Sequence, residues 1–158
     1  MHLTSENTAI VLDSTSDYPE AKARERFDNI RVVPLHVLFG SEDFLDHVGI
    51  SSRDFYERLK TAAKPPTTSQ PTPGEFLRAY EDLVRYDRIY SLHLSQKLSG
   101  TFQSAVQAAG IAGADRIRLV DSETASLAVA MLALAIERRL ARGTTDGELE
   151  ELIDRFKR

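Results

Sequence analysis

Cysteine is absent from this 158-residue sequence, and acidic residues outnumber basic residues by 24 to 20. Without cysteine there can be no disulfide, no thiolate nucleophile and no zinc–thiolate site. The formal net charge of -4 gives no broad cationic field, so neither nucleic acid nor an anionic membrane is an expected partner. No apolar run reaches the roughly 18 residues of a membrane-spanning helix. No basic segment followed by an apolar one opens the sequence, so we expect a cytoplasmic protein without stable membrane insertion.

The composition is that of an ordinary globular protein. Apolar residues make up 42% of the sequence and charged residues 28%, which are usual values for soluble domains. A chain of this length can bury a substantial hydrophobic core. We therefore interpret residues 1–158 as one domain.

Expected strands and helices alternate along the chain. We expect strands at residues 9–12, 30–39, 87–94 and 116–122, a small hairpin turning at residues 40–41, and helices at residues 18–27, 51–63, 75–84, 100–113, 123–143 and 145–158. Four prolines and one glycine in residues 64–74 predict a segment without regular structure. The alternation predicts a three-layer α/β/α fold, with a mostly parallel sheet of about four to five strands plus the hairpin.

Three polar clusters follow expected strands. They are "DSTSD" at residues 13–17, "LSQKLSG" at residues 94–100 and "DSETAS" at residues 121–126. The carboxyl ends of parallel strands share one edge of the sheet, and ligands of such sheets bind there. We therefore expect the three clusters to lie together.

The second cluster carries hydroxyl groups where a strand becomes a helix. Ser95, Ser99 and Thr101 lie in or beside the turn, and Gly100 lies inside it. The first N–H groups of a helix lack internal partners and carry partial positive charge, so an anion bound there is stabilised. Glycine would let that anion approach the backbone. The turn therefore favours a carboxylate or phosphate, although a plain serine N-cap, which contributes about 1 kcal/mol, explains the same residues.

A second group of hydroxyls lies between prolines, in the loop that contains Thr67, Thr68, Ser69 and Gln70. A stiff polar loop loses little entropy on binding. The loop contains no basic residue and lacks the glycine–lysine pattern of a nucleotide-binding loop. It suits a single negative charge better than a triphosphate, and an ordinary structural loop is an equally good interpretation.

Three aspartates and one histidine could bind a metal or take part in catalysis. Asp13, Asp17 and Asp121 end expected strands and could bind Mg²⁺, but aspartates in such positions more often cap helices, so we predict no metal site. His93 could pair with Ser99 as base and nucleophile. Because the G-x-S-x-G pattern is absent, a hydrogen-bonded structural histidine is favoured.

Residues 125–136 are apolar on almost every face of the expected helix. Such a pattern predicts burial on two sides. The sheet explains one side, and a partner, a second domain or a lipid chain could explain the other. We favour a helix buried within the layered sheet, and we expect self-association if an apolar face is left exposed.

Five motifs taken together resemble the DegV family of bacterial fatty-acid-binding proteins. They are "DSTSD", "VPL", "TSQPTPGEF", "LHLSQKLSGTFQSA" and "VDSETAS", in this order over roughly residues 8–150. The resemblance implies a long-chain fatty acid in a tunnel between two domains, with its carboxylate held by Thr68 and Ser99. We add Ser69, Ser95, Gly100 and Thr101 as further ligand-binding candidates. The resemblance also implies no catalysis, no cofactor besides the bound lipid, and in some members delivery of the acid to a fatty acid kinase.

The chain departs from this family in two respects. Gln96 stands where many members carry a second serine, and the chain ends at Arg158 although family members are about twice as long. We expect the sequence to correspond to the N-terminal domain alone, with the C-terminal domain absent. Since each buried CH₂ contributes roughly 0.8 kcal/mol, a half-open groove would hold a long chain less tightly than a closed tunnel. The alternatives are a serine-dependent acyl hydrolase or transferase and a ligand-free interaction module.

Overall fold

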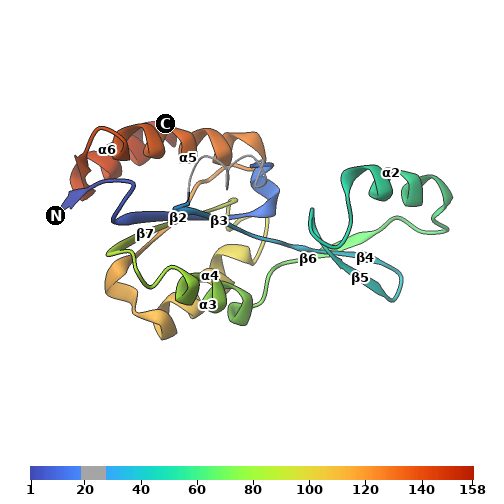
Figure 1. Cartoon of the computed structure of the whole chain (residues 1–158). Coiled ribbons are helices and arrows are strands. Elements are labelled where there is room, and N and C mark those ends of the chain that lie inside the picture. The colour runs from blue at the N-terminus through green and yellow to red at the C-terminus, as the bar shows by residue number, and fades with distance from the viewer. Residues whose placement is uncertain (19–27) are drawn as a thin grey trace.

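A four-stranded parallel sheet forms the centre of the protein in the computed structural model, which describes residues 1–18 and 28–158 (Figure 1). Its strands, in spatial order, are β3 (Ile30–Val33), β2 (Thr8–Asp13), β7 (Arg88–His93) and β8 (Ile117–Asp121). In register, Ile10 lies opposite Ile30 on one side and opposite Tyr90 on the other. The expected mostly parallel sheet is confirmed.

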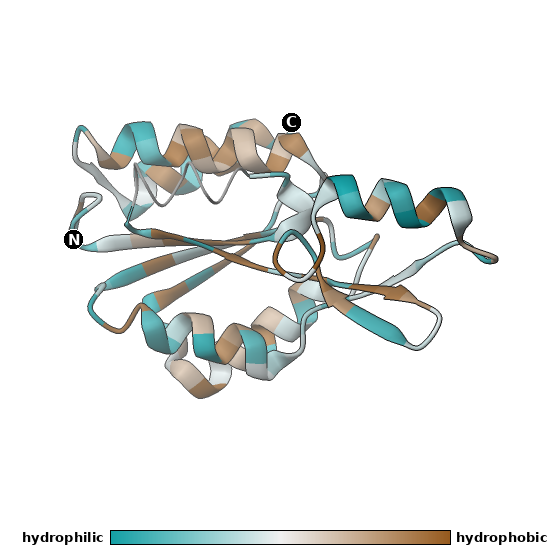
Figure 2. Cartoon of the chain, turned by 45° about the vertical axis from the view of Figure 1, so that its right-hand side comes forward, coloured by the Kyte–Doolittle hydropathy of each residue, from teal (hydrophilic) through white to brown (hydrophobic). Residues whose placement is uncertain are grey.

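Helices cover both faces of the sheet (Figure 1). One face packs against α5 (Leu127–Leu140) and α6 (Asp146–Phe156), and the other against α3 (Pro73–Asp82) and α4 (Thr101–Ala112). Successive side chains of a strand point to opposite faces. In β2, Ile10 and Leu12 therefore belong to one core while Ala9 and Val11 belong to the other, and all four are 0% exposed. The expected three-layer architecture is confirmed, and Figure 2 shows the apolar strands between the helical layers.

The helix boundaries follow their caps. Thr72 with Glu75 begins α3, and Thr145 with Glu148 begins α6, each pair forming a complete capping box. The expected capping box of the last helix is thus confirmed. The long apolar helix begins at Leu127 instead of residue 123, because Ser126 has a φ of +58°, which a right-handed helix cannot contain.

Short elements complete this part of the molecule, which we call the core and define as residues 1–18, 28–34 and 73–158. The strand β1 (His2–Leu3) pairs with β9 (Thr144–Thr145), and single turns form η1 (Ser14–Ser16) and η2 (Ala114–Arg116). The helix expected at residues 18–27 falls, apart from its first residue, outside the described residues. Among the described residues, no helix combines the length and the apolar character needed to cross a bilayer.

Residues 35–72 form a second unit, called the arm here, which extends to one side of the core (Figure 1). It contains β4 (His36–Phe39), β5 (Glu42–Leu45), α2 (Ser52–Thr61) and β6 (Thr67–Ser69). Its three strands form an antiparallel sheet in the order β5-β4-β6. The expected hairpin is confirmed, since β4 and β5 turn at Gly40, whose φ is +64°.

Two expectations about the arm were wrong. Residues 30–39 form two strands in different sheets, because Pro34 lacks the N–H that a continuing ladder needs and the chain leaves the core there. Residues 64–74 are not wholly irregular, because Thr67–Ser69 pair with β4 as an edge strand. The prolines of this segment lie outside the three paired residues and therefore do not interrupt the ladder.

Two helices expose apolar side chains. No side chain of α2 is buried, and Tyr56 is 62% exposed. On α5, Leu127 and Met131 are 60% and 59% exposed, and Leu134 is 39% exposed. The expectation that this long helix is buried on two sides is therefore wrong, because its outer side remains open.

Candidate functional site

The three polar clusters meet at the carboxyl edge of the parallel sheet, as predicted. The strands that precede them, β2, β7 and β8, are neighbours in the same parallel sheet. Hydrogen bonds join the clusters directly, from Leu94 N to Asp13 Oδ2 (3.2 Å), from Ser95 N to Thr124 O (2.8 Å) and from Gln96 N to Asp121 Oδ1 (3.2 Å). One continuous polar edge results, and the start of α4 lies in it.

The hydroxyl turn before α4 is internally ordered. Ser99 Oγ accepts a hydrogen bond from Thr101 N (3.2 Å) and lies 2.9 Å from Thr101 Oγ1. The N-cap position itself is Gly100, so Ser99 precedes the cap by one residue. Ser95 supports the turn from below, because its carbonyl oxygen accepts from Leu98 N (2.9 Å) and Ser99 N (3.3 Å). Thr101 and Ser95 are buried, whereas Ser99 is partly exposed beside the positive end of the helix dipole.

Gln70 connects the arm to this turn. Its Nε2 donates to the buried Ser104 Oγ on α4 (3.0 Å), and a Cβ atom added to Gly100 would overlap Gln70 Oε1. The φ of Gly100 is −75°, so any residue could adopt its backbone conformation. Glycine therefore leaves the space that the end of the Gln70 side chain occupies. From the sequence, Gln70 was expected only as a member of a polar loop, and its contact with α4 was not predicted.

The six predicted ligand-binding residues divide between these two places. Ser95, Ser99, Gly100 and Thr101 belong to the turn, and Thr68 and Ser69 belong to β6. Thr68 lies opposite Val37 of β4 and is exposed. Because Thr68 and Ser69 are consecutive residues of a strand, their side chains point to opposite faces of the arm sheet. One bound carboxylate can therefore contact the side chain of only one of them.

Behind the polar edge lies a buried hydrogen-bond series that starts at Asp13. Asp13 Oδ2 contacts His93 Nδ1 (3.0 Å), His93 Nε2 contacts Ser91 Oγ (2.7 Å), and Ser91 Oγ contacts Tyr80 OH (2.8 Å). All four residues are 0% exposed. Phe76 packs edge-on against the His93 ring, with centroids 4.9 Å apart.

The charges and hydrogen bonds of this buried series are mutually satisfied. Burial acts to raise the pKa of Asp13, but hydrogen bonds and the charge of His93, together with hydrogen bonds from Thr15 and Leu94, hold that pKa below its ordinary value. Burial raises the pKa of Tyr80 to about 12. Both ring nitrogens of His93 are engaged by Asp13 and Ser91, so neither is available to Ser99 as a base. His93 is hydrogen-bonded, as the favoured interpretation predicted.

The aspartates of the polar edge also accept hydrogen bonds from nearby backbone and hydroxyl groups. Asp13 is the N-cap of η1, Asp17 Oδ2 accepts from Ser126 Oγ (2.7 Å), and Asp121 Oδ1 accepts from Glu123 N (3.1 Å). Within residues 1–18 and 28–158, no three His, Asp or Glu side chains are grouped as a metal site would require. The expectation that such aspartates cap helices holds for Asp13 at η1 and is wrong for Asp121, because α5 begins only at Leu127, with Ser126 as its N-cap. The helix that was expected to start near Tyr18 lies, apart from its first residue, outside the described residues.

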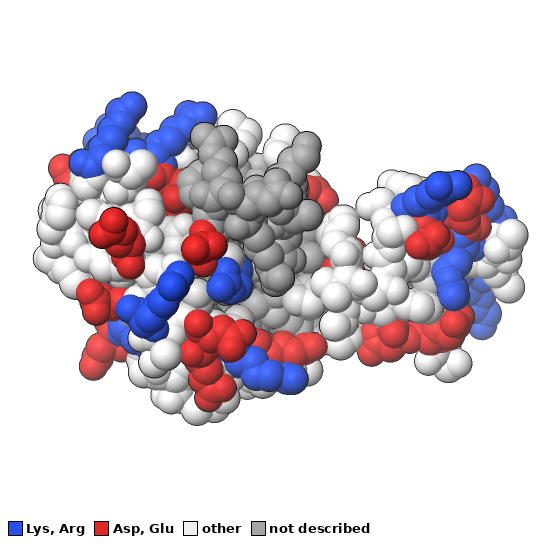
Figure 3. Space-filling view, in the orientation of Figure 1, with Lys and Arg blue, Asp and Glu red and all other residues white. Residues whose placement is uncertain are grey.

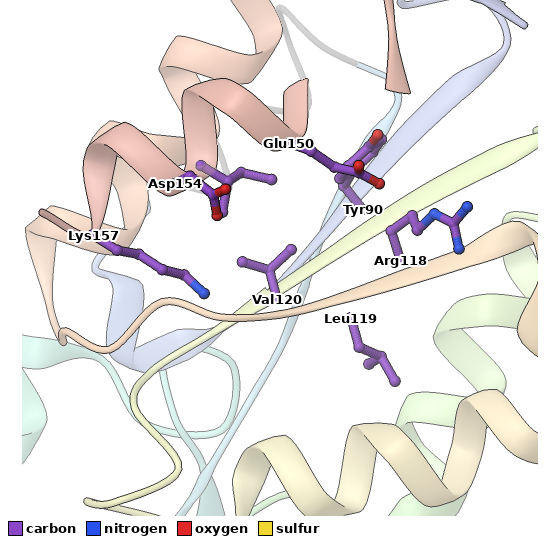
Figure 4. Close-up of a pocket in the computed structure, with 8 residues that line it drawn as sticks. Tyr90, Arg118, Leu119, Val120, Glu150, Asp154 and Lys157 are labelled. Atoms are coloured by element: carbon purple, nitrogen blue, oxygen red, sulfur yellow. The ribbon is translucent and has the colours of Figure 1, made fainter. Parts of the chain in front are cut away.

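Pockets of the described part of the chain lie away from the hydroxyl turn. One of about 170 Å³ lies between β8 and α6, where the acidic residues Glu150 and Asp154 lie between the basic residues Arg118 and Lys157 (Figure 4). This volume is below the roughly 300 Å³ of typical small-molecule sites. The second, of about 380 Å³, lies in the arm beside Phe39 and is largely apolar. Figure 3 shows both signs of charge interspersed over one face of the core and the arm, so no single-sign field marks a partner there.

Comparison with known proteins identifies relatives along almost the whole chain. The model of the family described as "Uncharacterised protein, DegV family" matches residues 7–158. A DegV domain-containing protein of Listeria monocytogenes is 36% identical over 156 residues, which are 97% of this chain and 54% of that protein.

Solved structures agree with this family match. A DegV family protein from Thermus thermophilus, described for its fatty acid binding, has a TM-score of 0.86 and 36% identity, covering 96% of this chain and 53% of its own. DegV of Bacillus subtilis, described as a fatty acid binding protein, has a TM-score of 0.85 and 34% identity, covering 96% and 54%. The chain thus spans about half the length of the relatives that it matches.

Proposed function

The chain belongs to the DegV family, and from this membership we propose that it binds a long-chain fatty acid through the acid's carboxylate. The observation that carries the proposal is the contact of Gln70 with the start of α4. That contact joins the residue two positions after Thr68 to the helix that follows Ser99, which supports a site shared by these two hydroxyl-bearing segments.

The chemistry of the two segments suits one carboxylate. The partly exposed Ser99 hydroxyl can donate to one oxygen, while the N–H groups of the first turn of α4 add positive potential. Thr68 can donate a second hydrogen bond from the arm. Thr101 orients Ser99 through the 2.9 Å contact between their hydroxyl oxygens, and Ser95 holds the backbone of the turn. Hydrogen bonds to an ionised acceptor are about twice as strong as neutral ones, so two donors suffice to orient the head group.

The proposed role is that of a carrier and not of an enzyme. His93 is engaged on both ring nitrogens, so it is not available to Ser99 as a base for attack on an acyl group. The proposed partner is a fatty acid kinase that would receive the bound acid, as the family resemblance implies. The open outer side of α5, with Leu127 and Met131, is the face that we propose for any self-association.

Titration calorimetry with palmitate tests the two hydroxyls. We expect Thr68→Ala and Ser99→Ala each to remove one charge-assisted hydrogen bond, which is worth about 1.5–3 kcal/mol and weakens binding by roughly tenfold or more. Neither substitution is expected to unfold the domain, because Thr68 is exposed and Ser99 is partly exposed.

Thr67→Ala is the matched control. Thr67 precedes Thr68 in β6, so its side chain points to the opposite face of the arm sheet. Its removal is expected to leave the affinity unchanged. Ser69→Ala decides whether the other face of β6 holds the carboxylate. Unchanged affinity of both the Thr68 and the Ser99 variants would rule out the assignment, and absence of a bound acid from native mass spectra of the purified wild type at every lipid concentration would rule out the carrier itself.

A further inference from the structure

The ring of His36, the first residue of β4, lies between two carboxylates. His36 Nδ1 is 2.9 Å from Asp43 Oδ1 in the arm, and His36 Nε2 is 3.1 Å from Glu75 Oε1 at the start of α3 in the core. Only the protonated imidazole can donate from both nitrogens at once. The His36 and Glu75 side chains are 19% and 20% exposed, so water screens their contact only in part.

The core end of this bridge is fixed. Glu75 Oε2 accepts from Thr72 N (2.7 Å) and Thr72 Oγ1 (2.8 Å) in the capping box of α3. The arm end of the bridge is β4, which pairs with β6, the strand of Thr68, in a register that sets His36 opposite Ser69 and Val37 opposite Thr68. A displacement of His36 from Glu75 would therefore also displace Thr68.

We propose that protonated His36 is a positioning residue that holds the arm against α3 and thereby fixes Thr68 relative to the turn of Ser99. The first half concerns only the protein's own conformation. The second half rests on the proposed function, since it assigns a consequence for ligand binding. The bridge acts beside the contact of Gln70, the residue that follows β6, with Ser104 on α4.

The charged groups around His36 favour its protonated form. Asp43 faces it from β5 and Glu75 from α3, while β6 contributes no titratable side chain. The remaining carboxylate of β5, Glu42, is paired with Arg58 at 2.8 Å. The hydrogen bond to Asp43 raises the pKa of His36, partial burial opposes the rise, and Glu75 adds to it.

The sign of the pH dependence follows from this elevation. The stabilisation of the docked arm is fully present below the ordinary imidazole pKa of about 6.5 and is lost as the pH rises through the higher pKa of the folded protein. A neutral ring keeps one N–H and turns a lone pair toward the other carboxylate, so one of the two contacts becomes repulsive.

Two measurements without ligand test the first half. Histidine NMR titration from about pH 5.5 to about pH 9 brackets the ordinary imidazole value. We expect His36 to titrate above that value and Asp43→Asn to lower its pKa. Hydrogen exchange of the peptide covering residues 64–72, corrected for the intrinsic pH dependence of exchange, is expected to lose protection as His36 deprotonates. In His36→Gln this protection is expected to be low and independent of pH.

His47→Asn is the matched control. His47 is another histidine of the arm, its side chain is 50% exposed, and its nearest carboxylate, Asp46, is 3.8 Å away. Asparagine tolerates the φ of +59° at this position. The control is expected to follow the wild type in both measurements. The proposal is overturned if His36 titrates at or below the ordinary value, or if the peptide in His36→Gln shows the same pH dependence as in the wild type.

Palmitate binding at the two ends of the pH range tests the second half. We expect wild-type affinity to fall by about two- to fivefold at the upper end, the range of a partly exposed ion pair, and the affinity of His36→Gln not to change with pH. Equal pH dependence in both proteins overturns the link between His36 and the ligand. If the wild type binds no palmitate at any pH, the fatty acid assignment fails, and the exchange and titration results decide the positioning role alone.

Discussion

The core and the arm are stabilised in different ways. In the core, both faces of the parallel sheet are covered, and β2 and β7 contribute side chains that are 0% exposed. In the arm, the helix α2 buries none of its side chains. It is held to the β4–β5 hairpin by Phe39 against Phe55 (5.6 Å between centroids) and by Arg58, which lies 4.7 Å above the Phe44 ring and pairs with Glu42.

This difference indicates that the position of the arm relative to the core can change more easily than the core itself. Burial of apolar surface is the dominant stabilising contribution in folding, and it is concentrated in the core. Polar contacts of the kind that join the arm to the core, such as those of His36 and Gln70, each contribute little and depend on conditions. The candidate site draws residues from both units, so its geometry is set by the more weakly held of the two.

The largest expected effect contrasts two aspartates that both contact a histidine. Asp13→Ala removes one partner of a pair in which both side chains are 0% exposed, and we expect it to lower the free energy of unfolding by about 3–5 kcal/mol. Asp43→Ala removes a carboxylate that is 52% exposed, and we expect about 1 kcal/mol or less. Urea denaturation measures both variants.

The pH dependence of the first variant provides an internal check. Since the folded-state pKa of Asp13 is below its ordinary value, its stabilisation is present above about pH 4 and is lost as the pH falls through the folded value. The difference between wild type and Asp13→Ala is therefore expected to narrow in acid. Similar losses for the two aspartates at neutral pH would contradict the contrast between core and arm.

A second contrast uses leucine in both units. The side chain of Leu12 is 0% exposed, so Leu12→Ala leaves a cavity in the core. We expect the free energy of unfolding to fall by about 2–5 kcal/mol. Leu59, on α2, is 40% exposed, and we expect Leu59→Ala to cost about 0.5 kcal/mol or less. Thermal unfolding followed by circular dichroism compares the two. A loss above 2 kcal/mol for Leu59→Ala would mean that α2 is part of the cooperative core.

A small change in stability is also expected at the junction of the units. In Gly100→Ala the new methyl group overlaps only the end of the flexible Gln70 side chain, so we expect the free energy of unfolding to change by less than about 1 kcal/mol. Palmitate affinity is nevertheless expected to fall, because Gln70 must leave Ser104. Gly110→Ala, where an added Cβ meets nothing within 4 Å, is the control on the same helix and is expected to bind normally.

The core could be predicted from the sequence because its signals are local. Short apolar runs such as residues 9–12 predicted the strands, and the box of Thr145 and Glu148 predicted the start of the last helix. The polar edge followed from the rule that parallel strands end on one side. Thr68 and Ser99 became candidates through the family resemblance, since their local patterns also fit an ordinary loop and an ordinary cap.

The contacts between the units could not be predicted in the same way. Gln70 meets Ser104 across 34 positions of sequence, and His36 meets Glu75 across 39. No periodicity reports such pairs, because they depend on how the arm is set against the core. The contact between His36 and Asp43 is easier to predict from the sequence, because the expected hairpin brings their two strands together. In that hairpin His36 lies opposite Leu45, two residues from Asp43 in the same strand.

Within the described residues, the polypeptide crosses between the two units at residues 33–36 and 69–73, and three of the six prolines of the sequence, Pro34, Pro71 and Pro73, lie in these crossings. A pyrrolidine ring locks φ near about −65°, so each crossing has fewer rotatable bonds than an ordinary connection. The arm is therefore expected to rotate as a rigid body about a hinge formed by these two short segments. Entry and exit of a ligand would then depend on the hinge angle between the arm and the core and would not require local unfolding of a loop.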